Sequence, residues 1–276
     1  MSKIIRKPVA AGTFYTGLAQ SLEREVTTYL QNVADSGLQL KRLYGIISPH
    51  AGYSCSAQTA AYGFRLLQNY PVKTAVVVAP SHDDYFRGVS IFDGEGFETP
   101  LGTVPVDTDF CQKLNDNSKI AKLSAAGHRS EHALEVQLPF LQKIYPDGFD
   151  LIPVSVGETS AEDLREFAEV LFKTAAKNQI MVVASSDLSH YYPYEIACRK
   201  DGHFIKLLED YDLESLGQGY DDQSLEACGL GPILVLLHFA RQFGSAKCRK
   251  LDYRTSGDTC GSKLQVVGYL SAAIYE

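Results

Sequence analysis

The sequence predicts a single-domain α/β protein with a central, mostly parallel or mixed sheet flanked by helices. Short apolar runs rich in valine and alanine alternate with longer stretches whose apolar residues recur at helical spacing. A run that is apolar at nearly every position, such as residues 74–79, suits a strand buried on both faces of a parallel sheet. The chain has 276 residues, 45% of them hydrophobic, so one domain over residues 1–276 with a sizeable core is expected.

The elements can be predicted in chain order from periodicity and from the residues that begin or end them. Strands are expected at residues 43–47, 74–79, 151–156, 180–184 and 264–274, with short antiparallel strands within 89–106 around a turn at 98–102. Helices are expected at residues 21–33, 56–68, 107–114, 130–144, 160–175, 194–209, 212–216 and 233–243. Ser21, Ser130 and Ser160 are the expected N-caps of their helices. A kink is expected at Pro139, and Pro232 is expected to open the last helix.

A histidine follows the carboxyl end of three of these predicted strands. His50 comes after residues 44–47, His82 after residues 75–79, and His190 after residues 180–184. Ligands of open α/β sheets bind outside the carboxyl ends of the strands, so these histidines can converge although they are far apart in sequence. The pattern predicts a metal site or an acid/base centre. The alternative is that each histidine only caps a strand or bonds a loop.

The bulk composition excludes some classes of partner. A net charge of −7 and a pI near 5.5 argue against a nucleic-acid or anionic membrane surface as the main partner. No stretch approaches the ~20 apolar residues of a membrane span, and the first residues lack the features of a signal peptide, so a cytoplasmic location is expected. Six cysteines are widely spread without a CxxC pair, and reduced thiols are expected.

Two further features could carry chemistry. Cys228 lies a few residues before a predicted helix start, where exposed N–H groups favour the reactive thiolate; the alternative is a small buried apolar residue. Glu131 and Glu135 are one turn apart on a predicted helix. They form either a solvated acidic face or a support for nearby ligands.

A series of short motifs along the chain resembles the Memo family, in the same order and over almost the whole chain. These motifs are Pro49-His-Ala-Gly-Tyr53, Pro80-Ser-His82, Thr99-Pro-Leu101, Glu131-His132 with Glu135, Leu138-Pro139, Ser185-Ser-Asp187 with His190, Cys228-Gly229 with Pro232, and Val267-Gly-Tyr269. The resemblance implies a fold like that of the class III extradiol dioxygenases. It also implies partnership with a radical-SAM protein and an AMMECR-type protein, which accompany members of this family in bacteria and archaea.

Carried onto this chain, the resemblance implies His50, His82 and Cys228 as metal ligands, with Asp187 and His190 lining the site. Extradiol dioxygenases hold ferrous iron with two histidines and a glutamate, whereas here the third position is similar to Cys228. Two imidazoles and a thiolate suit iron or copper, and also zinc, and leave a position open for water, oxygen or substrate. His190 is then the expected acid/base, with Asp187 or Glu131 orienting it.

Three other functions remain open at this point, and whether the protein is an enzyme is open with them. The first is a non-haem iron dioxygenase that acts on a small aromatic substrate. The second is a non-catalytic module whose pocket binds a peptide or partner segment. The third is a hydrolase with a Cys228–His190 nucleophile dyad, which would leave the other two strand-end histidines without a role.

Overall fold

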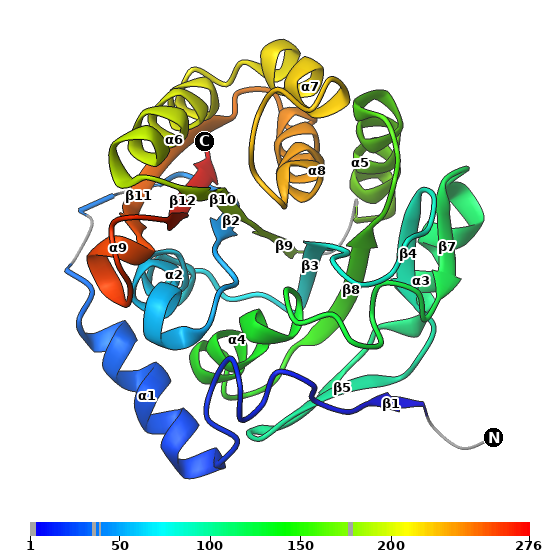
Figure 1. Cartoon of the computed structure of the whole chain (residues 1–276). Helices are drawn as coiled ribbons and strands as arrows, with labels where there is room; N and C mark the ends of the chain where they lie inside the picture. The colour runs from blue at the N-terminus through cyan, green and yellow to red at the C-terminus, as the bar shows by residue number, and fades with distance from the viewer. Residues whose placement is uncertain (1–3, 35–36, 39, 176–178) are drawn as a thin grey trace.

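The computed structural model describes residues 4–34, 37–38, 40–175 and 179–276. These residues form a single α/β domain with helices on both faces of a central sheet (Figure 1). Helix α2 (Tyr53–Leu67) packs on one face of the sheet and helix α8 (Leu230–Arg241) on the other. None of the described helices is both long and apolar enough to cross a membrane.

The main sheet of the described chain is mixed, as predicted. In spatial order its strands are β10 (Asp187–Tyr192), β12 (Val266–Tyr275), β2 (Leu43–Ser48), β9 (Ile180–Ser185), β3 (Thr74–Pro80), β8 (Asp150–Val156), β4 (Val89–Phe92) and β7 (Ala121–Ser124), while β11 (Lys247–Thr255) pairs with β12. Strands β2, β9, β3 and β8 are parallel and form the centre. Their carboxyl ends therefore meet at one edge, where the three strand-end histidines were predicted to converge.

A small second sheet contains β1 (Ile5–Arg6), β5 (Gly96–Thr99) and β6 (Gly102–Pro105). The antiparallel β5–β6 hairpin confirms the predicted turn, whereas β4 joins the main sheet. The remaining helices are α1 (Ala19–Gln31), α3 (Thr108–Asn117), α4 (Leu138–Ile144), α5 (Ala161–Ala175), α6 (Tyr194–Glu209), α7 (Leu213–Asp221) and α9 (Ser256–Thr259), with a 3-10 turn η1 (Glu135–Gln137) before α4.

The core follows the predicted apolar faces. Every residue of β3 is buried, and α2 buries the predicted inward positions, including Phe64 and Leu67. Gly63 lets this helix lie close to β2, because a Cβ there would be 2.9 Å from the Ile46 side chain.

Some predicted boundaries are wrong for local reasons. Helix α1 begins at Ala19, so Ser21 lies inside it and does not cap it. Helix α8 begins at Leu230, which makes Pro232 its third residue. The helix expected from Ser130 begins only at Leu138, after η1. Pro139 therefore lies in the first turn of α4, where backbone N–H groups have no partner within the helix. Its missing N–H costs no helical hydrogen bond there, and the helix does not need to kink.

The expectation of reduced thiols is wrong for Cys55 and Cys260. They form a disulfide with Cα atoms 5.1 Å apart, although 205 positions separate them in sequence. The physical reason is tertiary, because the fold places the first turn of α2 beside the end of α9 (Figure 1). The other cysteines, Cys111, Cys198, Cys228 and Cys248, are free thiols.

A buried carboxylate fixes the N-terminal segment to the domain. Glu135 is fully buried and pairs with the Arg6 guanidinium. It also accepts hydrogen bonds from the N–H groups of Val9 (2.8 Å) and Ala10 (2.9 Å) and from the Tyr15 hydroxyl (2.5 Å). A buried anion is tolerated because each of these donors replaces water. Residues 6–15 are thereby held against the loop that leads into η1.

Replacing this carboxylate should destabilise the fold strongly. Glu135→Gln leaves the buried Arg6 charge without its anion, and we expect a loss of about 3–5 kcal/mol in the free energy of unfolding. Urea unfolding followed by circular dichroism measures it, since the chain has no tryptophan. The control is Glu98→Gln, which removes the exposed pair with Lys7 and should cost less than about 1 kcal/mol. Equal losses in the two variants would contradict the anchoring role of Glu135.

Candidate metal centre

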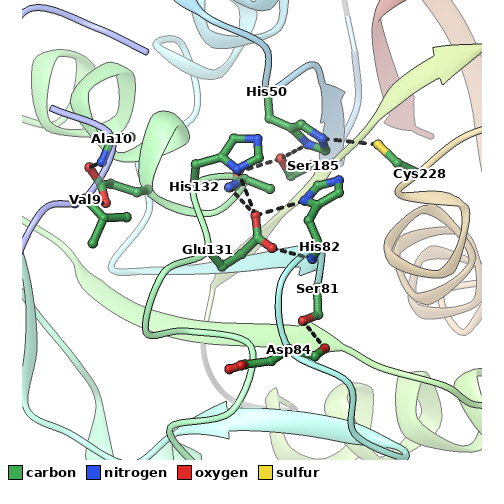
Figure 2. Close-up of polar contacts among 12 residues, drawn as sticks. Val9, Ala10, His50, Ser81, His82, Asp84, Glu131, His132, Ser185 and Cys228 are labelled. Carbon is green, nitrogen blue, oxygen red and sulfur yellow. Dashed lines mark hydrogen bonds and ion pairs between the residues drawn. The ribbon is translucent and has the colours of Figure 1, made fainter. Parts of the chain in front are cut away.

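Three imidazole rings meet at the carboxyl edge of the central sheet (Figure 2). His50 follows β2, His82 follows β3, and His132 lies in the loop before η1. The ring centroids are 5.2 Å apart for His50 and His82, 5.6 Å for His50 and His132, and 5.1 Å for His82 and His132. One nitrogen from each ring lies within 4.8 Å of the others, which makes these three residues a possible metal site.

The partners of each ring fix which nitrogen carries the proton. Nδ1 of His82 and Nδ1 of His132 both face Glu131 Oε1, at 3.0 and 3.2 Å. A carboxylate only accepts hydrogen bonds, so His82 Nδ1 is the donor of the bond to Glu131, whereas the His132 contact is an ion-pair distance and not a hydrogen bond. Nε2 of His82 therefore holds the lone pair, which is the tautomer that metal binding through this nitrogen requires.

His50 adopts the same tautomer through a different partner. The Ser185 hydroxyl donates to the Ala133 carbonyl at 2.7 Å, so it accepts from His50 Nδ1 at 2.9 Å. The His50 lone pair on Nε2 then faces Cys228 Sγ at 3.1 Å. Burial lowers the pKa of His50 well below its ordinary value, and the neighbouring imidazoles act in the same direction, so the ring is neutral.

Glu131 organises the cluster as a buried hydrogen-bond acceptor. Besides the His82 ring, it accepts from the N–H of His82 at 2.6 Å and from the N–H of Ala133 at 2.9 Å. Burial alone would raise the pKa of this carboxyl, but these bonds and the His82 ring outweigh burial and lower the pKa to about 2. The alternative of a solvated acidic face is wrong, because both Glu131 and Glu135 are buried and no helix carries them on a common face.

Cys228 lies at the end of the loop before α8. Its Sγ accepts from the Asp187 N–H at 3.3 Å, in addition to facing His50 Nε2. Burial raises the pKa of the Cys228 thiol, and the Asp187 carboxylate raises it further. The helix start therefore does not make this residue a thiolate by itself, and the thiol is the proton donor to His50. A cavity of about 190 Å³ reaches Cys228 between Ser81 and Tyr220.

Asp187 and His190 lie on β10 beside the cluster. Asp187 Oδ1 accepts from the His50 N–H at 2.8 Å. Burial raises the pKa of Asp187 to about 7, although hydrogen bonds from the His50 and Ala51 N–H groups oppose the shift. His190 is half-buried, and burial lowers its pKa. Among the described residues, His190 is outside the group of three histidines, so only two of the three strand-end histidines converge there.

His132 was not predicted as a candidate ligand. The sequence placed it on a helix behind Ser130, whereas the structure places it in a loop where its ring packs on Phe14 with centroids 4.2 Å apart. The available signal was its position directly after Glu131, a carboxylate that the sequence already offered as a support for nearby ligands.

Together, fold and site define an α/β protein whose histidine-rich centre lies at the carboxyl edge of a mixed sheet. A family model described as Memo-like protein matches residues 6–273. The chain belongs to the Memo family, as its motifs indicated, and this family has a class III extradiol dioxygenase-like fold.

Relatives agree with this family assignment, and one solved structure agrees with the fold. A MEMO1 family protein of Nitrosopumilus maritimus is 32% identical over 269 residues, covering 96% of this chain and 98% of the relative. One of Saccharolobus solfataricus is 34% identical over 280 residues, covering 97% of this chain and 98% of the relative. The crystal structure of the uncharacterized protein JW3007 from Escherichia coli K12 has a TM-score of 0.59 at 18% identity. It covers 84% of this chain and 99% of that protein, and it supports the fold alone.

The position of Cys228 depends on the close approach of its neighbour Gly229 to β9. A Cβ on Gly229 would lie 2.1 Å from the Ser185 carbonyl oxygen and 2.5 Å from the Ser186 Cβ. We expect Gly229→Ala to lower the free energy of unfolding by about 1–3 kcal/mol and to expose Cys228 to alkylation. The matched control is Gly202→Ala in α6, where no atom lies within 4 Å of the new methyl group and stability should hold or rise. If both variants behave alike in unfolding and alkylation rate, the close approach does not position the thiol.

Proposed function

We propose that this chain binds one redox-active iron or copper ion through His50, His82 and Cys228. The observation that carries the proposal is the protonation pattern of the cluster. His50 and His82 each have Nδ1 bonded to a fixed acceptor and Nε2 left with a lone pair. One of these lone pairs faces the Cys228 sulfur at 3.1 Å.

The donor set fits such an ion chemically. Imidazole and thiolate are the ligands from which iron and copper sites are commonly built, and zinc accepts them as well. Metal binding would displace the thiol proton that now lies between Cys228 and His50, so the raised thiol pKa is a property of the metal-free site. His132 is a further donor within reach of the other two histidines. A bound ion with an open position would supply binding and activation of water, oxygen or a small substrate.

Other residues of the chain have supporting roles in this proposal. Glu131 holds His82 in the required tautomer, and Ser185 does the same for His50. His190 and Asp187 lie beside the centre and would hold or release the protons of a bound substrate. Partnership with a radical-SAM protein and an AMMECR-type protein, and a cytoplasmic location, stay predictions from the sequence.

Removing single donors should separate the ligands from their neighbours. We expect His50→Ala and His82→Ala to lose nearly all iron or copper, because two ligands cannot hold the ion, while far-UV circular dichroism stays unchanged. Cys228→Ser should retain less metal and lose the absorption band that a thiolate ligand gives to Cu(II). The measurement is elemental analysis with absorption spectroscopy on protein purified without oxygen or added metal.

His203→Ala provides the control, since His203 is exposed on α6 and should bind as the wild type does. Wild-type metal content in both His50→Ala and His82→Ala would refute the site. Loss of metal in His132→Ala with retention in Cys228→Ser would instead assign three histidines as the ligands.

The support from Glu131 can be tested without touching a ligand. Glu131→Gln keeps the shape of the side chain but has only one acceptor oxygen, so it cannot accept from both the His82 ring and the His82 N–H, and it carries no negative charge. We expect metal affinity to fall about 10–100-fold, as measured by competition with a chelator. Glu158→Gln, at an exposed carboxylate, is the control and should leave affinity unchanged. An unchanged affinity in Glu131→Gln would show that the charged carboxylate with its two acceptors does not support the site.

A further inference from the structure

The Cys55–Cys260 disulfide joins two segments that border the candidate metal centre. Cys55 is in the first turn of α2, five positions after His50 and just beyond the turn His50-Ala51-Gly52. Cys260 is at the carboxyl end of α9. Neither cysteine takes part in the proposed metal binding, so the bond needs its own explanation.

The α9 end of the bond connects to the β10–β12 strand pair, in which β10 carries Asp187 and His190. The Cys260 N–H donates to the Ser256 carbonyl at 2.9 Å, and the Ser256 hydroxyl accepts from the Val267 N–H at 3.0 Å. Val267 is the β12 residue that pairs with His190 on β10. A short chain of contacts thus leads from Cys260 to the edge of the site.

The α2 end of the bond connects to the His50 turn itself. The Ser56 hydroxyl donates to the Ala51 carbonyl at 2.8 Å, and the Tyr53 N–H donates to the Phe14 carbonyl at 2.7 Å. The His50 N–H is held from the other side by Asp187. The disulfide therefore closes a ring of contacts that passes through His50, Asp187 and the β10–β12 edge.

This crosslink is open to chemical attack. Cys260 is exposed and Cys55 is half-buried. Residues 256–265 connect β11 to β12. This segment contains the four-residue helix α9 and two glycines, Gly257 and Gly261. None of the residues of α9 is buried, so few buried side chains hold this segment once the covalent bond is removed.

We propose that Cys55–Cys260 is a reducible crosslink that holds the His50 turn against the β10–β12 edge, so that a dithiol reductant loosens the centre and speeds metal loss. One thiolate of the dithiol attacks Cys260 Sγ, the S–S bond breaks, and Cys55 leaves as a thiolate that takes up a proton. The second thiol of the dithiol then displaces Cys260 from the mixed disulfide. The dithiol is oxidised to its disulfide, and Cys55 and Cys260 are reduced to thiols by the same two electrons.

The metal consequence rests on the proposed function, whereas the crosslink and its mechanical effect do not. The first measurement is therefore a thiol count on denatured, chelator-treated protein, before and after reduction. With six cysteines in the chain and four of them free, we expect four alkylated thiols before reduction and six after it, with Cys55 and Cys260 as the new sites. Six alkylated thiols in protein purified in air without reductant would overturn the proposal.

The second measurement is hydrogen–deuterium exchange of metal-free protein. We compare the wild type with the double variant Cys55→Ser/Cys260→Ser, and we use Cys198→Ser as the control that keeps the crosslink. Exchange should rise at residues 50–56 and 256–268 in the double variant and stay unchanged in the control. Unchanged exchange at residues 50–56 would overturn the proposal even if the bond exists.

The third measurement is the release of bound Co²⁺ to a chelator, followed by absorption. The double variant should release Co²⁺ roughly tenfold faster than the crosslinked protein, a change of the size that outer contacts of metal sites produce. Equal release rates would overturn the coupling between crosslink and centre. If no form of the protein binds Co²⁺, iron or copper, the proposed function fails, and the exchange measurement alone decides whether the crosslink holds the His50 turn.

Discussion

The site depends on two buried carboxylates in one short irregular segment, residues 131–137. Glu131 accepts a hydrogen bond from the His82 ring and lies beside the His132 ring, and Glu135 binds Arg6 and the N-terminal segment. Burying two anions costs free energy unless donors replace the lost water, so the donors must be in place for the domain to fold. This requirement brings the loop after β3, the loop before η1 and the N-terminal segment together at one edge of the sheet. The same bonds that satisfy Glu131 orient the His82 imidazole.

The central elements could be predicted because their signals are local. An apolar run such as β3 reads as a buried strand without its neighbours, and α6 was predicted with its observed bounds, Tyr194–Glu209. Strand β11 could not be found this way, since Lys247–Thr255 alternates charged and apolar residues at the edge of the sheet and has no continuous apolar run. The Cys55–Cys260 bond is invisible in sequence spacing, because only the packing of α2 against α9 brings the two residues together.

The candidate site was predictable to the extent that it lies at strand ends. His50 and His82 follow parallel strands, and sheet geometry requires such residues to share an edge. The position of His132 depends instead on whether the backbone around it forms helical hydrogen bonds or bonds to a side chain. The Glu131 carboxylate accepts a hydrogen bond from the Ala133 N–H. This bond gives the backbone N–H a partner that a helix would otherwise supply, and residues 131–134 do not form a helix. Sequence periodicity cannot show that outcome, because Glu131 is held in place by His82, 49 positions away.

The fold alone does not imply that this chain has extradiol dioxygenase activity. The iron of such enzymes takes a carboxylate as its third ligand beside two imidazoles. Here the nearest carboxylates already have other partners, Glu131 with the His82 ring and Asp187 with the His50 N–H. Either one could bind a metal only by giving up bonds that hold a histidine in place. The donor that faces a free imidazole lone pair is the Cys228 sulfur. A thiolate gives more electron density to the ion than a carboxylate does and favours softer metals, so the same fold would hold a centre of different reactivity.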